Sequence, residues 1–220
     1  MNLFKNILFT LLAIAFVVLV PQSGIINKII PLPFSYSIVI LVFVWLFLKL
    51  SKENFSSLGF SFKRFTARAV LNGTVAGIIL FGFLQYAFFP LLNMIIPLSP
   101  ADLGDFSKIR HNTGTYLFFL LMGWLIGGIY EEIVFHGFIF TRLEKLFTGK
   151  YAVPISFLLT NIIFAVYHWQ QGTSGVINAF MAGIVYHALI LRYKRNMWYG
   201  IVCHAVFDTI ALTFIYLGYW

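Results

Sequence analysis

The sequence carries little charge and almost no cysteine. Only 10% of the 220 residues are charged, and just seven of them are acidic. A soluble globular domain carries about 25% charged residues. The shortage therefore excludes a fold that faces water on every side. The single cysteine, Cys203, excludes an internal disulfide framework and a cysteine-rich zinc site.

Hydrophobic residues, at 60% of the chain, are abundant instead. They form long runs without the apolar–polar alternation that a transmembrane barrel needs in each strand of ~10 residues. A run of about 20 apolar residues is long enough for a helix to cross the hydrocarbon core of a bilayer. The sequence therefore predicts an all-α, polytopic transmembrane bundle in a cell membrane, with lipid as its surroundings.

Seven apolar segments are expected to form the spans. The first precedes further spans and lacks a small-residue cleavage site, so it is interpreted as a retained helix and not as a signal peptide. Residues 52–68 mix phenylalanines with Lys and Arg, which is typical of a segment lying in the interface on anionic headgroups, and equally of an ordinary basic loop. The expected spans are residues 3–20, 34–50, 69–96, 115–140, 152–169, 174–191 and 197–217.

The Lys and Arg residues predict an orientation. With the N-terminus in the cytoplasm, 12 of the 15 lie on the inner side, and the remaining three are Lys28, Lys108 and Arg110. Such an excess on one side is the signature of cytoplasmic loops. The formal net charge of +8 is then a topology signal, so nucleic-acid binding is not expected.

Three of the seven acidic residues, Glu131, Glu132 and Asp208, fall inside expected spans. A charged carboxylate at the centre of a bilayer costs at least ~2.5–3.5 kcal/mol, so an ionisable residue within a span is a functional candidate by default. His168 and His204 lie within spans as well. His187 does too, but it matches no motif and is interpreted as structural.

Helical spacing pairs these residues. Glu132 with His136, Phe164 with His168, and His204 with Asp208 are each four apart and share a helix face. A carboxylate can take a proton from water while an imidazole orients that water. The same groups could bind zinc or line a proton pathway, although no HExxH sequence is present. From the residues alone, these alternatives stay open.

The motifs resemble one family. Glu131-Glu132-Ile-Val-Phe-His136-Gly137 is similar to the EExxxR motif of the CPBP intramembrane proteases, the type II CAAX prenyl endopeptidases and bacteriocin-processing relatives also called the Abi family. Phe164-Ala-Val-Tyr-His168 resembles its FxxxH motif, and His204-Ala-Val-Phe-Asp208 its HxxxN or HxxxD motif. The resemblance covers about half of the chain. It suggests a division into N-terminal helices, 1–114, and a catalytic core, 115–220.

The resemblance implies a role for each motif residue. Glu131 is the general base that activates water, helped by His168, and Glu132 supports the site. His204 and Asp208 bind the developing oxyanion or the water. Apart from the resemblance, Phe164 is expected to pack behind His168 and not to react. No cofactor is favoured; in a zinc-dependent mechanism, the ligands would be Glu131, His168, His204 and Asp208.

Two positions depart from the family pattern. His136 stands where the family usually has Arg, which is charged at any pH, whereas a histidine titrates near about 6.5. Asp208 stands where Asn is commoner. An ionised Asp cannot donate a hydrogen bond to an oxyanion. Asp208 is therefore expected to be protonated, to orient His204 or to bind metal.

The depths of these residues in the membrane do not match in straight, upright helices. At 1.5 Å per residue, Glu131 lies roughly 15 Å from the inner edge and His168 about 21 Å. Helix tilt, or a re-entrant start of the fifth span, has to bring them level.

The function implied is hydrolysis of a membrane-associated peptide, either a CAAX-type lipidated C-terminus or a leader-like peptide. Two other classes of function remain. One is a non-catalytic scaffold or bacteriocin self-immunity protein, and the other is a transporter coupled to protons or metal ions.

Overall fold

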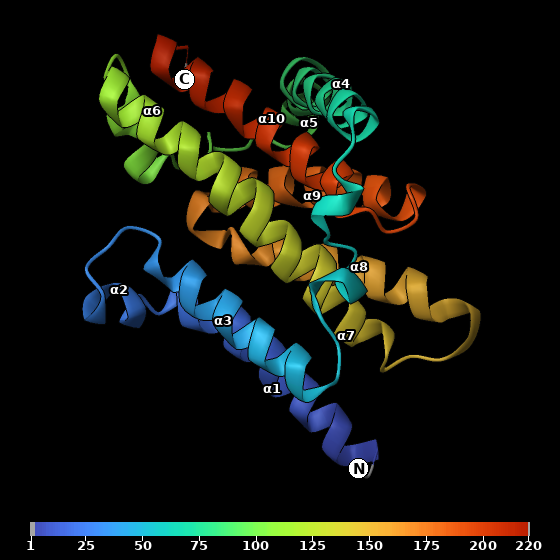
Figure 1. Ribbon diagram of the computed structural model, residues 1–220. Helices are drawn as coiled ribbons and strands as arrows, with labels where there is room; N and C mark the ends of the chain where they lie inside the picture. Colours follow the sequence, from blue (N-terminus) through green and yellow to red (C-terminus); the bar gives the residue numbers. More distant parts are fainter. Residues whose placement is uncertain (1–2, 220) are drawn as a thin grey trace.

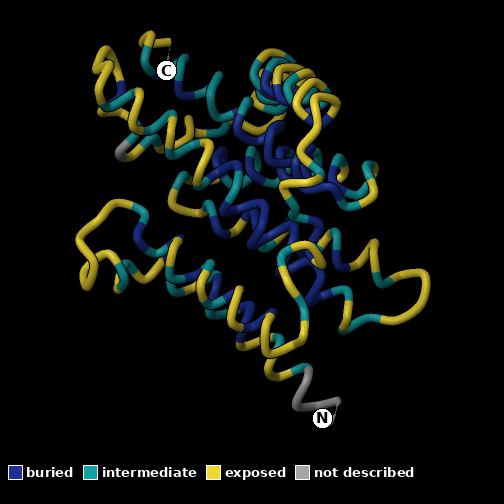
Figure 2. The backbone as a smooth tube through the Cα atoms, in the orientation of Figure 1, coloured by how far each residue is buried: buried dark blue, intermediate teal, exposed yellow. Residues whose placement is uncertain are grey.

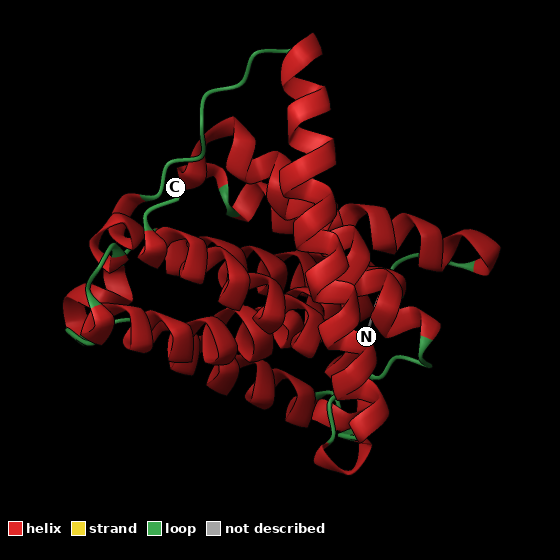
Figure 3. Cartoon of the chain, turned by 90° about the horizontal axis from the view of Figure 1, so that it is seen from above, coloured by secondary structure: helices red, strands yellow, loops and turns green. Residues whose placement is uncertain are grey.

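The computed structural model describes residues 3–219, without the side chains of residues 3–6 and of Asp105, and every regular element in it is helical (Figures 1 and 3). The α-helices are α1 (Leu3–Gln22), α2 (Ile25–Ile29), α3 (Ser35–Leu50), α4 (Ala67–Phe83), α5 (Phe89–Ile95), α6 (Thr113–Met122), α7 (Phe140–Glu144), α8 (Ala152–Tyr167), α9 (Gly172–Arg192) and α10 (Met197–Leu217). Two π-helices, η3 (Leu84–Phe88) and η5 (Gly123–Ile139), continue α4 and α6. Short 3-10 turns lie at η1 (Phe55–Leu58), η2 (Phe62–Arg64), η4 (Gly104–Ile109), η6 (Gly149–Tyr151) and η7 (Trp169–Gln171).

The prediction of an all-helical membrane fold is confirmed. Each of the seven expected segments is helical, although α1 runs two residues beyond the expected end at Val20. In the described part of the chain, five helices are long and apolar enough to cross a membrane, or six if α3 and the turns after it form one broken span. Residues 7–22 of α1 form a shorter apolar helix.

Residues 55–64 leave α3 at an angle of 98°. Trp198 anchors them, because its ring packs against Phe60, Phe62 and Phe65. A segment at nearly a right angle to a membrane-spanning helix runs roughly parallel to the membrane surface, as an interfacial segment does. The interfacial interpretation of residues 52–68 stays a prediction.

The third expected span is broken into α4, η3 and α5. Pro90 lies at the start of α5 and has no N–H for the helical bond to the carbonyl four residues earlier. The π-turn that precedes it, η3, accommodates this missing bond.

The helix that carries Glu131 and Glu132 is continuous from Thr113 to Glu144 and 32 residues long. Its middle 17 residues, η5, are π-helical, where the sequence predicts an ordinary helix. Bonds from each residue to the fifth one along widen the turn. A span of this length is longer than the ~20 residues that the bilayer requires, so it has room to tilt.

The loops gather at two ends of the bundle. At the first, which we call the basic end, Arg64 donates to the carbonyls of Lys194 and Arg195, and Arg195 pairs with Glu144. It comprises residues 49–68, 142–151 and 192–196. At the opposite end, Ser174 donates to Ser99 and the Gln171 carbonyl accepts from Asp102. This opposite end comprises residues 21–34, 96–113 and 168–173.

Helix α10 lies at the centre of the packing and contacts α4, η5, α9 and α6. The buried residues concentrate in this middle region, while α1 and α3 are exposed along one side (Figure 2). The helices that carry the three motifs, η5, α8 and α10, therefore meet in the interior.

Candidate active site in the bundle interior

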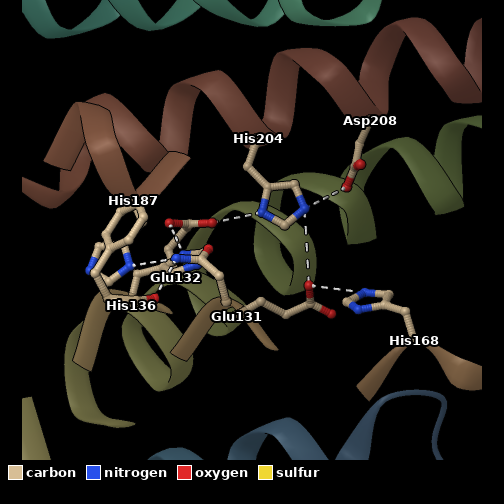
Figure 4. Close-up of polar contacts among 9 residues, drawn as sticks. Glu131, Glu132, His136, His168, His187, His204 and Asp208 are labelled. Carbon is tan, nitrogen blue, oxygen red and sulfur yellow. Dashed lines mark hydrogen bonds and ion pairs between the residues drawn. The ribbon is translucent and has the colours of Figure 1, made fainter. Parts of the chain in front are cut away.

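Glu131 and Glu132 lie on different sides of η5 (Figure 4). Glu132 is fully buried at 0% exposure, whereas Glu131 retains 8% and lines a large cavity. The two carboxylates, adjacent in the sequence, thus have different surroundings. Glu132 lies in the protein interior, and Glu131 lies on the wall of the cavity.

Glu132 lies between two histidines. His136 Nδ1 is 2.8 Å from Glu132 Oε2, and His204 Nδ1 is 2.9 Å from Glu132 Oε1. An ionised carboxylate only accepts hydrogen bonds, so each Nδ1–H donates to it. Glu132 therefore fixes the orientation of His204 and leaves its Nε2 atom pointing toward the cavity (Figure 4).

Four polar atoms converge on the other side of His204. Glu131 Oε2 lies 3.7 Å from His168 Nε2 and 4.0 Å from His204 Nε2. His204 Nε2 lies 3.7 Å from Asp208 Oδ2. These separations are too long for direct hydrogen bonds and are of the length that a single bridging water spans. The arrangement can hold and polarise one small polar group.

His168 reaches this cluster because α8 ends just before it. The His168 N–H bonds to Ala165 O, so the Phe164 carbonyl has lost its helical partner, and His168 Nδ1 donates to it at 2.8 Å. A carbonyl oxygen can only accept, so Nε2 of the neutral ring carries the lone pair that faces Glu131.

The packed bundle brings Glu131 and His168 to the same level. Glu131 Oε2 lies 3.7 Å from His168 Nε2. Residues 149–167 form one continuous helical span, so the fifth span has no re-entrant start, and the relative tilt of the helices has to account for the match in depth.

Aromatic rings hold the histidines in place. Phe164 lies edge-on to His168 with ring centroids 4.7 Å apart, and it also contacts His136 at 5.1 Å. Its expected position behind His168 is therefore observed. Tyr186 stacks on His204 at 4.3 Å with an interplanar angle of 17°. No pattern in the sequence singled out Tyr186.

Glycine makes room for the cluster on η5. A Cβ atom at Gly127 would collide with the Asp208 carboxylate and lie 3.3 Å from His204 Nε2. At Gly200 it would lie 2.9 Å from Glu132 Oε2. Gly123 and Gly128 pack against α10, whereas Gly127 is part of the site itself.

His187 lies next to the cluster, although the sequence marked it only as structural. Its ring is 4.8 Å from that of His136, and Asn161 Nδ2 donates to its Nδ1 at 3.2 Å. The position of His187 inside an apolar span is the sequence feature that could have marked it as part of the site. His187 does not contact Glu131 or Glu132 and does not line the cavity. Its contacts therefore support only a role in positioning His136.

A cavity of about 920 Å³ opens beside the cluster. Glu131, His168, His204 and Asp208 form part of its wall, whereas Glu132 and His136 do not. A space of that size accommodates several residues of a peptide. Within the described residues, no group of three or more His, Cys, Asp or Glu side chains is arranged to hold a metal ion.

Residues 113–210 match a family model described as type II CAAX prenyl endopeptidase Rce1-like. This segment belongs to the Rce1-like family. It runs from the start of α6 into α10 and contains every residue of the three motifs, so the family prediction is confirmed there. No curated protein and no solved structure matched the chain.

The match of residues 113–210 to a family of endopeptidases implies a peptide substrate. The side chains of the cluster come from η5, α10 and the C-terminal cap of α8, and all of them lie within the matched residues 113–210. The first three spans lie outside the matched segment.

Proposed function

We propose that this Rce1-like protein is an intramembrane endopeptidase that cleaves a membrane-associated peptide with a glutamate-activated water. The observation that carries the proposal is the convergence of Glu131 Oε2, His168 Nε2, His204 Nε2 and Asp208 Oδ2, at separations of 3.7–4.0 Å, on the wall of a cavity large enough for a peptide.

In the proposed reaction, a water held between Glu131 and His168 attacks the scissile carbonyl carbon. Its proton passes to the Glu131 carboxylate, and the carbonyl electrons move onto oxygen. Collapse of this tetrahedral intermediate breaks the C–N bond, and Glu131 returns the proton to the leaving amine. The products are a carboxylic acid and an amine, with no covalent enzyme intermediate.

His204 is placed to stabilise the oxyanion. Its Nδ1–H is held by Glu132, and when Nε2 is protonated it can donate toward the cavity. Asp208, 3.7 Å from that Nε2 atom, then acts by orienting and neutralising the imidazolium instead of donating as an Asn would. The structure thus favours the orienting role among those expected for Asp208.

The decisive experiment is cleavage of a quenched fluorescent peptide panel by purified protein, wild type and Glu131→Gln, with and without a chelator. We expect chelator-resistant cleavage in the wild type and at least about 10²-fold slower cleavage in Glu131→Gln, because general-base catalysis supplies 10²–10⁴-fold. Glu144→Gln is the matched control, since Glu144 pairs with Arg195 at the basic end, away from the cavity.

Other outcomes select the alternatives. Activity that is lost with chelator and restored by zinc would favour a metal site formed by Glu131, His168, His204 and Asp208. A scaffold or self-immunity protein would be favoured if no cleavage depended on Glu131 and if cells carrying Glu131→Gln kept the phenotype of cells with the wild-type protein. Substrate flux in proteoliposomes without cleavage would favour a transporter.

A further inference from the structure

The mouth of the catalytic cavity lies at one end of the bundle only. Apart from Asn93 on α5, its exposed lining residues lie in the opposite end, away from the basic end. They include Gln22, Ser99, Pro100, Ala101, Asp102 and Gln170. No loop residue of the basic end lines it.

Toward the basic end the site is closed. Glu132, Phe135, Phe138 and Met197 have 0% exposure, and His136 has 1%. These side chains fill the interior between the cluster and the loops of the basic end. A peptide that reaches Glu131 must therefore approach from the opposite end or from the lipid beside it.

The two ends differ sharply in charge. The basic end holds Lys49, Lys52, Lys63, Arg64, Arg68, Arg142, Lys145, Lys150, Arg192, Lys194 and Arg195, whereas the opposite end holds Lys28, Lys108 and Arg110. Loops rich in Lys and Arg stay in the cytoplasm. The mouth of the cavity then faces the non-cytoplasmic side.

The lining of the cavity also restricts the charge of a substrate. Its carboxylates are Asp102, Glu131 and Asp208, and among the described residues no Lys or Arg lines it. Apolar rings, including Phe34, Phe106 and Phe119, supply much of the remaining wall. His204, when protonated, is already neutralised by Glu132 and Asp208. A free carboxylate close to the scissile bond would therefore meet net negative charge, with no Lys or Arg among the described lining residues to pair with it.

We infer that the substrate is an apolar, non-acidic peptide segment presented on the non-cytoplasmic side of the membrane. This inference rests on the proposed function for its chemistry, but the sidedness stands on the cavity and the charge distribution alone. A cytosolic protein with a lipidated tail and a free terminal carboxylate does not fit this mouth.

The sidedness is tested by labelling intact cells with a membrane-impermeant maleimide. Ala101→Cys lies at the mouth and Thr148→Cys at the basic end, and both positions are exposed. Cys203 is fully buried, so labelling of the unsubstituted protein measures the background from this native cysteine. We expect Ala101→Cys to be labelled in intact cells and Thr148→Cys only after permeabilisation. The reverse pattern would overturn the inference.

Cleavage in oriented vesicles tests the substrate class. We expect an impermeant apolar peptide to be cleaved by right-side-out vesicles and not by sealed inside-out ones, with both active once detergent is added. Cleavage by inside-out vesicles alone would refute the sidedness and leave the peptidase intact. No cleavage even in detergent would refute the proposed function, and the labelling would still decide the sidedness.

A matched pair of peptides tests the charge restriction. The two differ only in a terminal carboxylate or carboxamide three residues beyond the cleaved bond. We expect the carboxamide to have a kcat/KM at least about 10-fold higher, and equal values or a preference for the carboxylate would contradict a non-acidic substrate.

Discussion

Glu131 and Glu132 are neighbours in sequence but have different surroundings. Glu132 accepts hydrogen bonds from His136 and His204, so both of its oxygens are engaged. Glu131 makes only longer contacts, of 3.7 and 4.0 Å, and faces the cavity. A group that already accepts two hydrogen bonds is poorly placed to take a proton from water, which favours Glu131 as the base.

His136 can fill the position of the family's Arg without carrying a permanent charge. Its Nδ1–H donates to Glu132 whether the ring is neutral or protonated. The hydrogen bond that orients Glu132 therefore does not require a charged ring. The substitution at this position is compatible with an assembled site.

Gly127 provides a residue-level test of the geometry. We expect Gly127→Ala to lower kcat by about 10–100-fold, because its methyl group would displace the Asp208 carboxylate, and displacements near 1 Å have effects of that size. The assay is peptide cleavage, with thermal unfolding measured in detergent.

The control for Gly127 is Gly82→Ala, since no atom lies within 4 Å of a Cβ placed at Gly82. This variant should retain activity. A Gly127→Ala protein with wild-type kcat would show that the position of Asp208 is unimportant for the reaction.

Among the elements, α4 and α10 pack most closely through two glycines four residues apart. A Cβ at Gly73 would lie 2.7 Å from Val202 Cβ, and one at Gly77 would lie 2.6 Å from the Cys203 carbonyl oxygen. Small residues at this spacing let helix backbones approach in membranes. Helix α4 thus supports the helix that carries His204 and Asp208.

We expect Gly77→Leu to destabilise the protein by about 1–3 kcal/mol, as overpacking of a close interface does, and to reduce cleavage by shifting α10. Gly82→Leu on the same helix is the matched comparison, because that position is open. Thermal unfolding in detergent measures the effect. Equal stability of the two variants would show that the α4–α10 contact contributes little.

On the scale of the whole molecule, the basic end is tied together by Glu53. Its carboxylate pairs with Arg142 and Lys145 and thus joins the segment after α3 to α7. Burial raises the pKa of Glu53, but the hydrogen bonds and positive charges of Arg142 and Lys145 outweigh it, and the pKa lies below its usual range. The side chain of Arg142 is only 5% exposed, so it depends on this partner.

A lowered pKa in the folded state means that Glu53 stabilises the protein at pH above its unfolded value, about 4.3. This stabilisation is lost as the pH falls through the folded value. We expect Glu53→Gln to cost about 1–3 kcal/mol at neutral pH by leaving buried Arg142 without its carboxylate, and the difference from wild type to shrink below about pH 4.

Glu144→Gln is the comparison for Glu53. Its partner Arg195 is 42% exposed, and exposed ion pairs contribute about 0–1 kcal/mol. Thermal unfolding from pH 3 to 7 measures both variants. A Glu53→Gln protein whose deficit stays constant over that range would contradict the assigned ion pair.

The sequence by itself determined the helices, because the length of an apolar run decides whether it can cross a bilayer. It also marked Glu131, His168, His204 and Asp208 as candidate site residues, because ionisable groups within a membrane span are costly; that assignment stays a prediction. The division into residues 1–114 and 115–220 stays a prediction.

Only the tertiary structure decided which oxygen faces which nitrogen, that Gly127 makes room for Asp208, and at which end the cavity opens. Spacing along one helix predicts a shared face, as for Glu132 and His136. Contacts between helices depend on their tilt, rotation and local winding, such as the π-turns of η5. A pattern within one segment does not contain these quantities, since they arise when the segments pack together.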